Sequence, residues 1–160
     1  MKKAILGLGS NMGDRLAYLH QAMEQINQFP QTTLLRCSSI YETEPWGNLN
    51  QGNFLNCCCE IYTDLTPLKL LEACLALENQ LGRVRNEVWG ERTIDIDLLI
   101  VEGETSDEIT LTLPHSRIRQ RGFVLVPLQE LYPNGNALGY EFSESLQTIG
   151  TDGITLFAKH

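Results

Sequence analysis

The stretch that most constrains this chain runs from Trp89 to Ile100 and reads W-G-E-R-T-I-D-I-D-L-L-I. From Thr93 onward isoleucines alternate with Asp95 and Asp97, which is the pattern of a β-strand. In a strand both aspartates point to one face, with Cα atoms roughly 6.5 Å apart. The residues after them are apolar, as in a buried strand. The sequence therefore predicts a pair of carboxylates where a buried strand leaves the core.

Such a pair predicts a site for hard cations. Carboxylates at this spacing can hold one cation, or two cations bridged by substrate oxygens. The alternative is a half-exposed strand with a solvated acidic face, which is the commoner meaning of an isolated D-x-D. The neighbourhood favours a site, because arginines precede and follow the pair at Arg83, Arg85, Arg92, Arg117, Arg119 and Arg121.

The arginines stand out against an acidic chain. The net charge of -8 argues against general binding to nucleic acid or to an anionic membrane. Six of the twelve basic residues lie between Arg83 and Arg121, and no lysine occurs between Lys69 and Lys159. The planar fork of arginine matches phosphate oxygens. We expect a small polyanionic ligand carried with a metal; the alternative is surface salt bridges to Glu87, Glu91, Glu102 and Glu104.

Length and cysteine content indicate one intracellular domain. A chain of 160 residues, 1–160, can form a single domain with a sizeable core. The five cysteines contain no C-x-x-C pair and are odd in number, so we expect buried free thiols in a reducing cytoplasm. The apolar run near the N-terminus is too short for a signal sequence, and no stretch approaches the length of a transmembrane helix.

Hydrophobic periodicity predicts the element order β-α-β-β-α-β with C-terminal additions. This is the split βαβ order, in which two helices cover one face of an antiparallel sheet. The expected fold class is therefore α+β, a ferredoxin-like sandwich with a C-terminal extension of short strands and helices. The expected elements are strands at 3–8, 33–41, 53–63, 93–101 and 109–113 and helices at 16–26 and 67–82, with a polar loop at 83–91.

The glycines near the N-terminus suggest a dinucleotide-binding fold, which the spacing disfavours. Gly7, Gly9 and Gly13, at the end of the first strand and beyond it, have the spacing G-x-G-x-x-x-G, not the G-x-G-x-x-G fingerprint. The acidic residue expected about 20 positions later is also missing. We expect these glycines to permit a tight turn, and a nicotinamide oxidoreductase is disfavoured.

One strand carries residues suited to a flat heterocycle. Phe54 and Asn56 lie two apart on the mixed face of the strand at 53–63, where they could stack on a ring and hydrogen-bond to its edge. The alternative, in which Phe54 packs under a helix and Asn56 caps a turn, stays equally open on these residues alone.

Taken together, the motifs resemble a known family. W-G-E-R-T-I-D-I-D-L-L, then L-P-H and R-G-F-V-L-V-P-L, resembles 6-hydroxymethyl-7,8-dihydropterin pyrophosphokinase of folate biosynthesis. G-L-G-S-N, S-S-I-Y-E-T-E-P, N-F-L-N and L-G-R-V-R extend the resemblance over residues 4–131. It implies transfer of a pyrophosphoryl group from ATP to the pterin hydroxymethyl, with release of AMP.

The resemblance also implies residue roles on the ATP side. Asp95 and Asp97 match the ligands of two Mg²⁺ ions that bridge the ATP phosphates. The residues matching triphosphate contacts are Arg92, His115 and Arg121. Arg83, Arg85 and Trp89 match a flexible loop that closes over ATP. The catalytic set so implied is Arg83, Arg92, Asp95, Asp97, His115 and Arg121, and Glu78 and Thr112 complete the nucleotide-binding set.

On the pterin side, Phe54 and Phe123 match the two aromatics that sandwich the ring, and Asn56 matches its hydrogen-bonding amide. Thr43 and Glu44 match loop positions whose backbone hydrogen-bonds to the edge of the ring, and Asp95 also faces this substrate. The partners implied are ATP and a dihydropterin, with no nucleic acid and no membrane, for a cytoplasmic monomer.

Three positions depart from the family pattern. Val88 stands where a basic residue is usual, Thr110 where some members carry an arginine, and Ser116 where proline or an aromatic is common. These departures bear on nucleotide affinity. A non-catalytic nucleotide-sensing module on the same scaffold is the other class considered, and the R-x-x-D-x-D stretch speaks against it.

Overall fold

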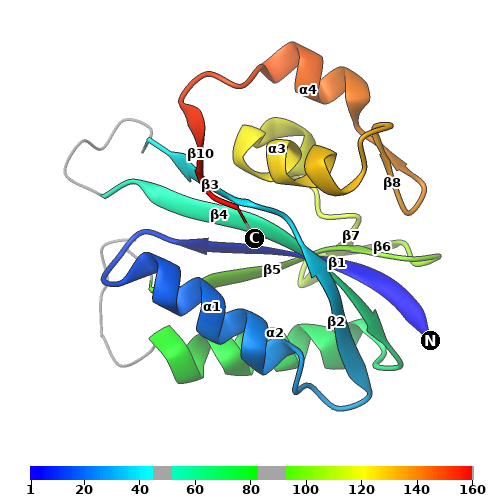
Figure 1. Ribbon diagram of the computed structural model, residues 1–160. Coiled ribbons are helices and arrows are strands. Elements are labelled where there is room, and N and C mark those ends of the chain that lie inside the picture. The colour runs from blue at the N-terminus through cyan, green and yellow to red at the C-terminus, as the bar shows by residue number, and fades with distance from the viewer. Residues whose placement is uncertain (45–51, 83–92, 160) are drawn as a thin grey trace.

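An antiparallel sheet of six strands forms the centre of the computed structural model, which describes residues 1–44, 52–82 and 93–159 (Figure 1). The strand path is β10-β3-β4-β1-β5, and β2 also pairs with β4; every pair in this sheet is antiparallel. The elements are β1 (Lys2–Ser10), α1 (Arg15–Ile26), β2 (Thr32–Cys37), β3 (Ile40–Thr43), β4 (Phe54–Thr63), α2 (Pro67–Gly82), β5 (Asp95–Val101), β6 (Ser106–Glu108), β7 (Leu111–Leu113), a 3-10 turn (Ile118–Gln120), α3 (Gly122–Leu131), β8 (Asn136–Ala137), β9 (Tyr140–Glu141), α4 (Ser143–Ile149) and β10 (Ile154–Ala158).

Helices cover both faces of the sheet (Figure 1). On one face α1 and α2 pack on alternate residues of β1, among them Ala4, Leu6 and Leu8. On the other face α3 packs over Ile5 and Leu99, and α4 packs against α3 (Figure 1). Burying one such leucine or isoleucine side chain contributes roughly 1.5–3 kcal/mol. The prediction of a mixed helix and strand fold with an antiparallel sheet is confirmed, and the second face carries helices as well.

Side-chain caps begin the first two helices where the sequence places them. The Asp14 carboxylate accepts a hydrogen bond from the backbone N–H of Ala17 at 3.1 Å. The Thr66 hydroxyl accepts one from the N–H of Lys69 at 3.2 Å, directly before α2. Each cap pairs an N–H group that the first helical turn leaves without a partner. The predicted start of α2 is therefore confirmed.

The predicted strand at 33–41 is two strands. It breaks at Ser38. The N–H of Ser38 donates to the carbonyl of Cys58 at 2.8 Å, and the hydroxyl of Ser38 accepts from the N–H of Cys58 at 3.0 Å. β2 and β3 thus pair with separate parts of β4. The break lets the chain follow the long strand β4 while the ladder register shifts.

The prediction that Gly7 and Gly9 form a turn is wrong, because both lie inside β1. A Cβ atom at Gly9 would lie 2.7 Å from Nδ2 of Asn56, so this position needs glycine for close approach. Gly13, with φ of +68°, does occupy the turn before α1.

The C-terminal segment folds onto the sheet more fully than its sequence suggested. The apolar stretch around Pro127 is helix α3, and the residues after it form β8, β9, α4 and β10. β10 pairs with β3 and so extends the sheet. Within the described ranges, no helix has the length and apolar character needed to cross a membrane.

Candidate active site

The two aspartates of β5 share one face of the sheet, as predicted. Across the ladder Asp95 pairs with Gly9 of β1 and Asp97 pairs with Gly7. Residues paired in this way point their side chains to the same face, so β1 places no side chain beside either carboxylate. Both aspartates are half-buried, and the space above them is open to ligands.

Two cavities meet at these aspartates. The larger has a volume of about 500 Å³ and the smaller of about 330 Å³. Asp95, Asp97 and Arg121 line both cavities. The face of β5 and the start of α3 therefore form a wall that two ligands could share.

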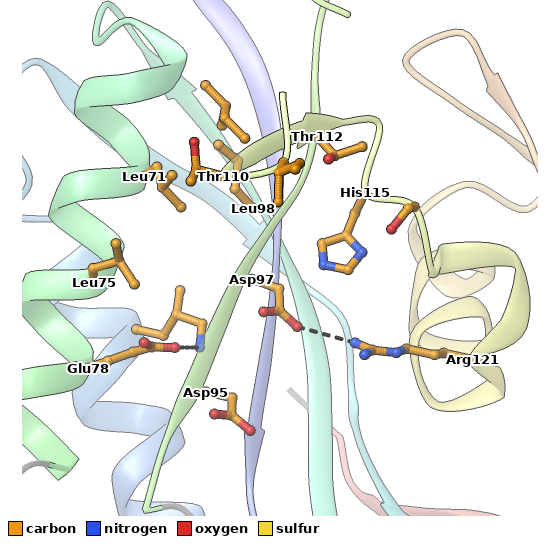
Figure 2. A pocket seen from close by; sticks show the side chains of 14 residues that line it. Leu71, Leu75, Glu78, Asp95, Asp97, Leu98, Thr110, Thr112, His115 and Arg121 are labelled. Atoms are coloured by element: carbon orange, nitrogen blue, oxygen red, sulfur yellow. Dashed lines mark hydrogen bonds and ion pairs between the residues drawn. The ribbon is translucent and has the colours of Figure 1, made fainter. Parts of the chain in front are cut away.

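The larger cavity joins a polar end to an apolar end. Figure 2 shows Asp97, His115 and Arg121 together on one side of it, with Glu78 reaching β5 from α2. The rest of the cavity is formed by α2, β5 and the segment around β7, whose lining residues include Leu71, Leu75, Ile109, Thr110, Leu111, Thr112 and Ser116. Ile109 is 98% exposed, which leaves a large apolar side chain uncovered at the rim.

Arg121 is held at the boundary of the cavities by two contacts. Its Nη1 lies 3.5 Å from Oδ2 of Asp97 (Figure 2). Its Cζ lies 5.6 Å from the centroid of the Phe123 ring, within the range of a cation–π contact. The guanidinium is therefore placed between the carboxylate pair and an aromatic wall of the smaller cavity.

His115 presents a neutral imidazole. The N–H of Arg117 donates to its Nδ1 at 3.2 Å, so the ring proton of the neutral form lies on Nε2. Burial lowers the pKa of His115 below its usual 6.5; the nearby charge of Asp97 opposes this, and those of Arg121 and Arg117 add to it. At neutral pH the ring can donate one hydrogen bond from Nε2 to an acceptor.

The smaller cavity combines aromatic walls with polar atoms that lack partners. Phe54, Phe123, Asn56 and Thr43 line it. Asn56 Nδ2 donates to the carbonyl of Leu8 at 3.4 Å, which orients the amide. Among the described residues, the buried Oδ1 of Asn56 and Oγ1 of Thr43 have no hydrogen-bond partner. A flat ligand with N–H donors would satisfy such acceptors.

Comparison with known proteins identifies the family. The profile described as "7,8-dihydro-6-hydroxymethylpterin-pyrophosphokinase (HPPK)" matches residues 5–133. A 2-amino-4-hydroxy-6-hydroxymethyldihydropteridine pyrophosphokinase of Methylorubrum extorquens is 46% identical over 154 residues, which cover 96% of this chain and 98% of that protein. The chain belongs to the HPPK family. A Bacillus subtilis protein with the same name is also 46% identical, over 80% of this chain and 77% of its own length.

A solved HPPK-containing protein shares the fold. The crystal structure of wild-type Plasmodium falciparum HPPK–DHPS aligns with a TM-score of 0.66 and 14% identity. The alignment covers 92% of this chain and 43% of that longer chain. The family that the motifs indicated is confirmed by the profile match and by the relatives at 46% identity, and this structure shows that the fold is shared.

The described candidate residues of the HPPK family pattern gather at the two cavities. Glu78, Thr112 and His115 line the larger cavity, and Phe54, Asn56, Phe123, Thr43 and Glu44 line the smaller. The backbone N–H of Glu44 donates to the carbonyl of Gly153 at 3.4 Å. The predictions for Arg83, Arg85, Val88, Trp89 and Arg92 concern residues outside the described ranges.

Not every arginine near the aspartates joins the site. Arg119 donates to the carbonyl of Glu141 at 2.9 Å and lies over the Tyr140 ring at 4.6 Å. Arg117 lines neither cavity and meets His115 through its backbone. Clustering in the sequence marked the region correctly but did not separate Arg121, which contacts Asp97, from Arg119, which binds the carbonyl of Glu141.

Sequence reasoning missed two parts of the site. One is the glycine pair of β1 opposite the aspartates, which the sequence analysis assigns to a turn. The other is the bond from the N–H of Ile96 to Oε2 of Glu78, at 2.6 Å. A signal for the first was present, since alternate glycines inside a strand mark close approach of a ligand or another backbone. The second has no local signal, because it joins residues 18 positions apart.

The residues present fit a hard divalent cation. The described residues hold no cluster of three or more histidine, cysteine or acidic side chains able to bind a metal. Two carboxylates alone suit Mg²⁺ carried by a nucleotide, because Mg²⁺ keeps several waters and uses one or two carboxylates plus substrate phosphates. Asp97 is 40% exposed, so its carboxylate can reach such a ligand.

Proposed function

We propose that the larger cavity binds ATP, the smaller cavity binds 6-hydroxymethyl-7,8-dihydropterin, and the pyrophosphoryl group passes between them over Asp95 and Asp97. As a member of the HPPK family the chain is a diphosphotransferase of folate biosynthesis and uses ATP as co-substrate. The observation that carries the assignment of sites is that the aspartates and Arg121 line both cavities.

The smaller cavity suits a pterin. Phe54 and Phe123 offer aromatic faces for the bicyclic ring, and such stacking contributes about 0.5–1.5 kcal/mol per pair beyond burial. The amino and ring N–H groups of a pterin can donate to Oδ1 of Asn56 and Oγ1 of Thr43, both without partners among the described residues. Leaving a buried acceptor unpaired costs roughly 1–3 kcal/mol, so these two atoms favour a ligand with donors over a plain hydrocarbon ring.

The larger cavity suits a nucleotide triphosphate. Arg121 and the Nε2–H of His115 supply donors at the end that touches the aspartates. The apolar end, formed by Leu71, Leu75 and Leu111, can cover a base. In this orientation the phosphates lie toward the shared wall and the base lies toward β7. Thr112 and Glu78 belong to the same cavity and take part in forming the nucleotide site.

The reaction requires placement and charge neutralisation more than covalent help. The pterin hydroxymethyl oxygen bonds to the β-phosphorus of ATP and loses its proton, while the bond from that phosphorus to the oxygen bridging the α-phosphate breaks and AMP leaves. Arg121 stabilises charge as it moves toward the leaving phosphate. Asp95 and Asp97 would hold two Mg²⁺ ions with the phosphates, and bound Mg²⁺ neutralises phosphate charge and orients the reacting oxygens.

We also propose a more specific description of the fold and of the protein's state. The antiparallel order β5-β1-β4-β2, with α1 and α2 on one face, supports a ferredoxin-like split βαβ core. Strands β6 to β10 with α3 and α4 form its C-terminal extension. Residues 1–160 form a single domain that works as a cytoplasmic monomer, binding neither nucleic acid nor a membrane. Family membership disfavours the alternative of a non-catalytic nucleotide-sensing module.

The test is product analysis with a matched pair of variants. The chain with ATP, Mg²⁺ and the pterin should form AMP and pterin diphosphate in equal amounts, separated by chromatography, and no AMP without the pterin. Asp97→Ala should reduce the rate ~100-fold or more, because it removes one carboxylate of the shared wall. Asp107→Ala removes an exposed aspartate of β6 and should have no effect. Release of ADP, or equal rates for the two variants, would overturn the proposal.

A further inference from the structure

The carboxylate of Glu78 reaches from one element into the backbone of another. Glu78 lies on α2, one turn after the buried Cys74, and its Oε2 accepts a hydrogen bond from the N–H of Ile96 at 2.6 Å (Figure 2). Hydrogen bonds to a charged acceptor are shorter and roughly twice as strong as neutral ones. This bond therefore ties helix α2 to strand β5 at one defined peptide group.

That peptide group lies between the two aspartates. The N–H of Ile96 belongs to the peptide that joins it to Asp95, and Asp97 follows directly. β5 ends the strand path of the sheet, with β1 as its ladder partner. Ile96 itself is 3% exposed and faces the core against α2, opposite Leu8. On the side of β5 away from β1, Glu78 supplies an acceptor where a neighbouring strand would otherwise do so.

We propose that Glu78 is a positioning residue, which sets the separation and direction of the Asp95 and Asp97 carboxylates by fixing the peptide between them. This inference rests on the proposed function, since it concerns how the shared wall holds metal and nucleotide. Outer groups that orient metal ligands typically change metal affinity 10–100-fold when they are removed. In this role Glu78 acts because its side-chain oxygen accepts a hydrogen bond from the backbone N–H of Ile96. Its negative charge matters less than this hydrogen bond.

Two substitutions separate the acceptor from the charge. Glu78→Gln keeps an oxygen that can accept from the N–H of Ile96, whereas Glu78→Ala removes it. Glu72→Ala is the matched control, because Glu72 is an exposed acid of the same helix with a side chain 59% exposed. Cooperative thermal unfolding of each variant establishes that it is folded before binding is measured.

The first measurement is binding of Mn²⁺ with an ATP analogue, followed by electron paramagnetic resonance. Glu78→Ala should weaken Mn²⁺ binding about tenfold, Glu78→Gln at most about threefold, and Glu72→Ala not at all. Pterin affinity should fall less than Mn²⁺ affinity in Glu78→Ala, because Glu78 lines only the larger cavity and acts on the smaller one only through the shared aspartates. Equal losses of Mn²⁺ affinity in Glu78→Gln and Glu78→Ala would mean that Glu78 acts through its charge or as a direct metal ligand. That result would overturn the inference.

The second measurement is hydrogen exchange at the amide of Ile96. It should be protected in the unmodified chain and in Glu78→Gln, and should exchange at least about tenfold faster in Glu78→Ala. Unchanged protection in Glu78→Ala would contradict the inference. Asp97→Ala distinguishes failure of this inference from failure of the proposed function. If Asp97→Ala leaves Mn²⁺ binding intact, the proposed function fails. If Asp97→Ala loses Mn²⁺ binding while Glu78→Ala binds Mn²⁺ normally, only the role of Glu78 is overturned.

Discussion

Nη1 of Arg121 lies 3.5 Å from Oδ2 of Asp97, so a cation and an anion face each other where the two cavities meet. Both side chains are partly exposed, at 26% and 40%, and a pair of this kind contributes little to folding stability. Under the proposed function, its value lies in holding an arginine fork for phosphate beside a carboxylate for the metal.

Arg121→Lys should keep the fold and lose most of the activity. Lysine retains the charge but not the bidentate fork, so we expect kcat to fall about 100-fold with the unfolding temperature nearly unchanged. Single-turnover kinetics and a thermal scan measure both quantities. Arg119→Lys, at an arginine bound to the carbonyl of Glu141, is the control and should turn over normally.

Phe123→Ala should weaken pterin binding about tenfold and ATP binding less than about threefold, because it removes an aromatic wall of the smaller cavity only. Calorimetric titration with each ligand measures the two affinities. Phe157→Ala, at a ring 43% exposed on β10, is the matched control. Equal loss of both affinities would place Phe123 in the general fold and not in the pterin site.

His115 should titrate below its usual pKa of 6.5 in the ligand-free protein, because burial disfavours its charged form. A group whose folded pKa is lowered this way contributes stability that is complete above about pH 6.5 and is lost as the pH falls through the folded pKa. Histidine ring signals in NMR, assigned with His115→Gln, test the direction. A pKa at or above 6.5 would contradict the environment described.

Tyr41 should stay protonated to high pH. Its hydroxyl donates to Oε1 of Glu130 at 2.5 Å, and burial together with that carboxylate raises its pKa to about 12. The stability it contributes is therefore complete below about pH 10 and is lost as the pH rises toward 12. In Tyr41→Phe the deficit in unfolding free energy should shrink over this interval, as measured by urea unfolding. A deficit that stays constant with pH would contradict the assignment.

The sequence predicts best those parts of the fold that local chemistry determines. β1, β4 and β5 show alternation or apolar runs, and α2 begins after Thr66 with a cap that the structure contains. The break at Ser38 was missed because its cause is a pair of hydrogen bonds to Cys58, 20 positions away. β10 was missed because its partner β3 lies far earlier in the chain, and its residues show no alternating burial.

In the candidate site too, local sequence predicts some features, and others depend on the three-dimensional fold. The shared face of Asp95 and Asp97 follows from strand geometry alone. Clustering alone does not separate Arg121 from Arg119; the family resemblance singled out Arg121, and the turn before α3 places it against Asp97. The two cavities arise where β1, β4, α2, β5, β7 and α3 meet, and no single segment contains that information.

The measurement that tests the central claim most directly is a crystal structure of the chain with Mg²⁺, the pterin and an ATP analogue carrying a methylene group between the α- and β-phosphates. That group replaces the oxygen whose bond to phosphorus breaks, so the complex cannot react. We expect the pterin between Phe54 and Phe123, the analogue in the larger cavity, and Mg²⁺ on Asp95 and Asp97 between them. A pterin in the larger cavity, or phosphates remote from both aspartates, would contradict the account.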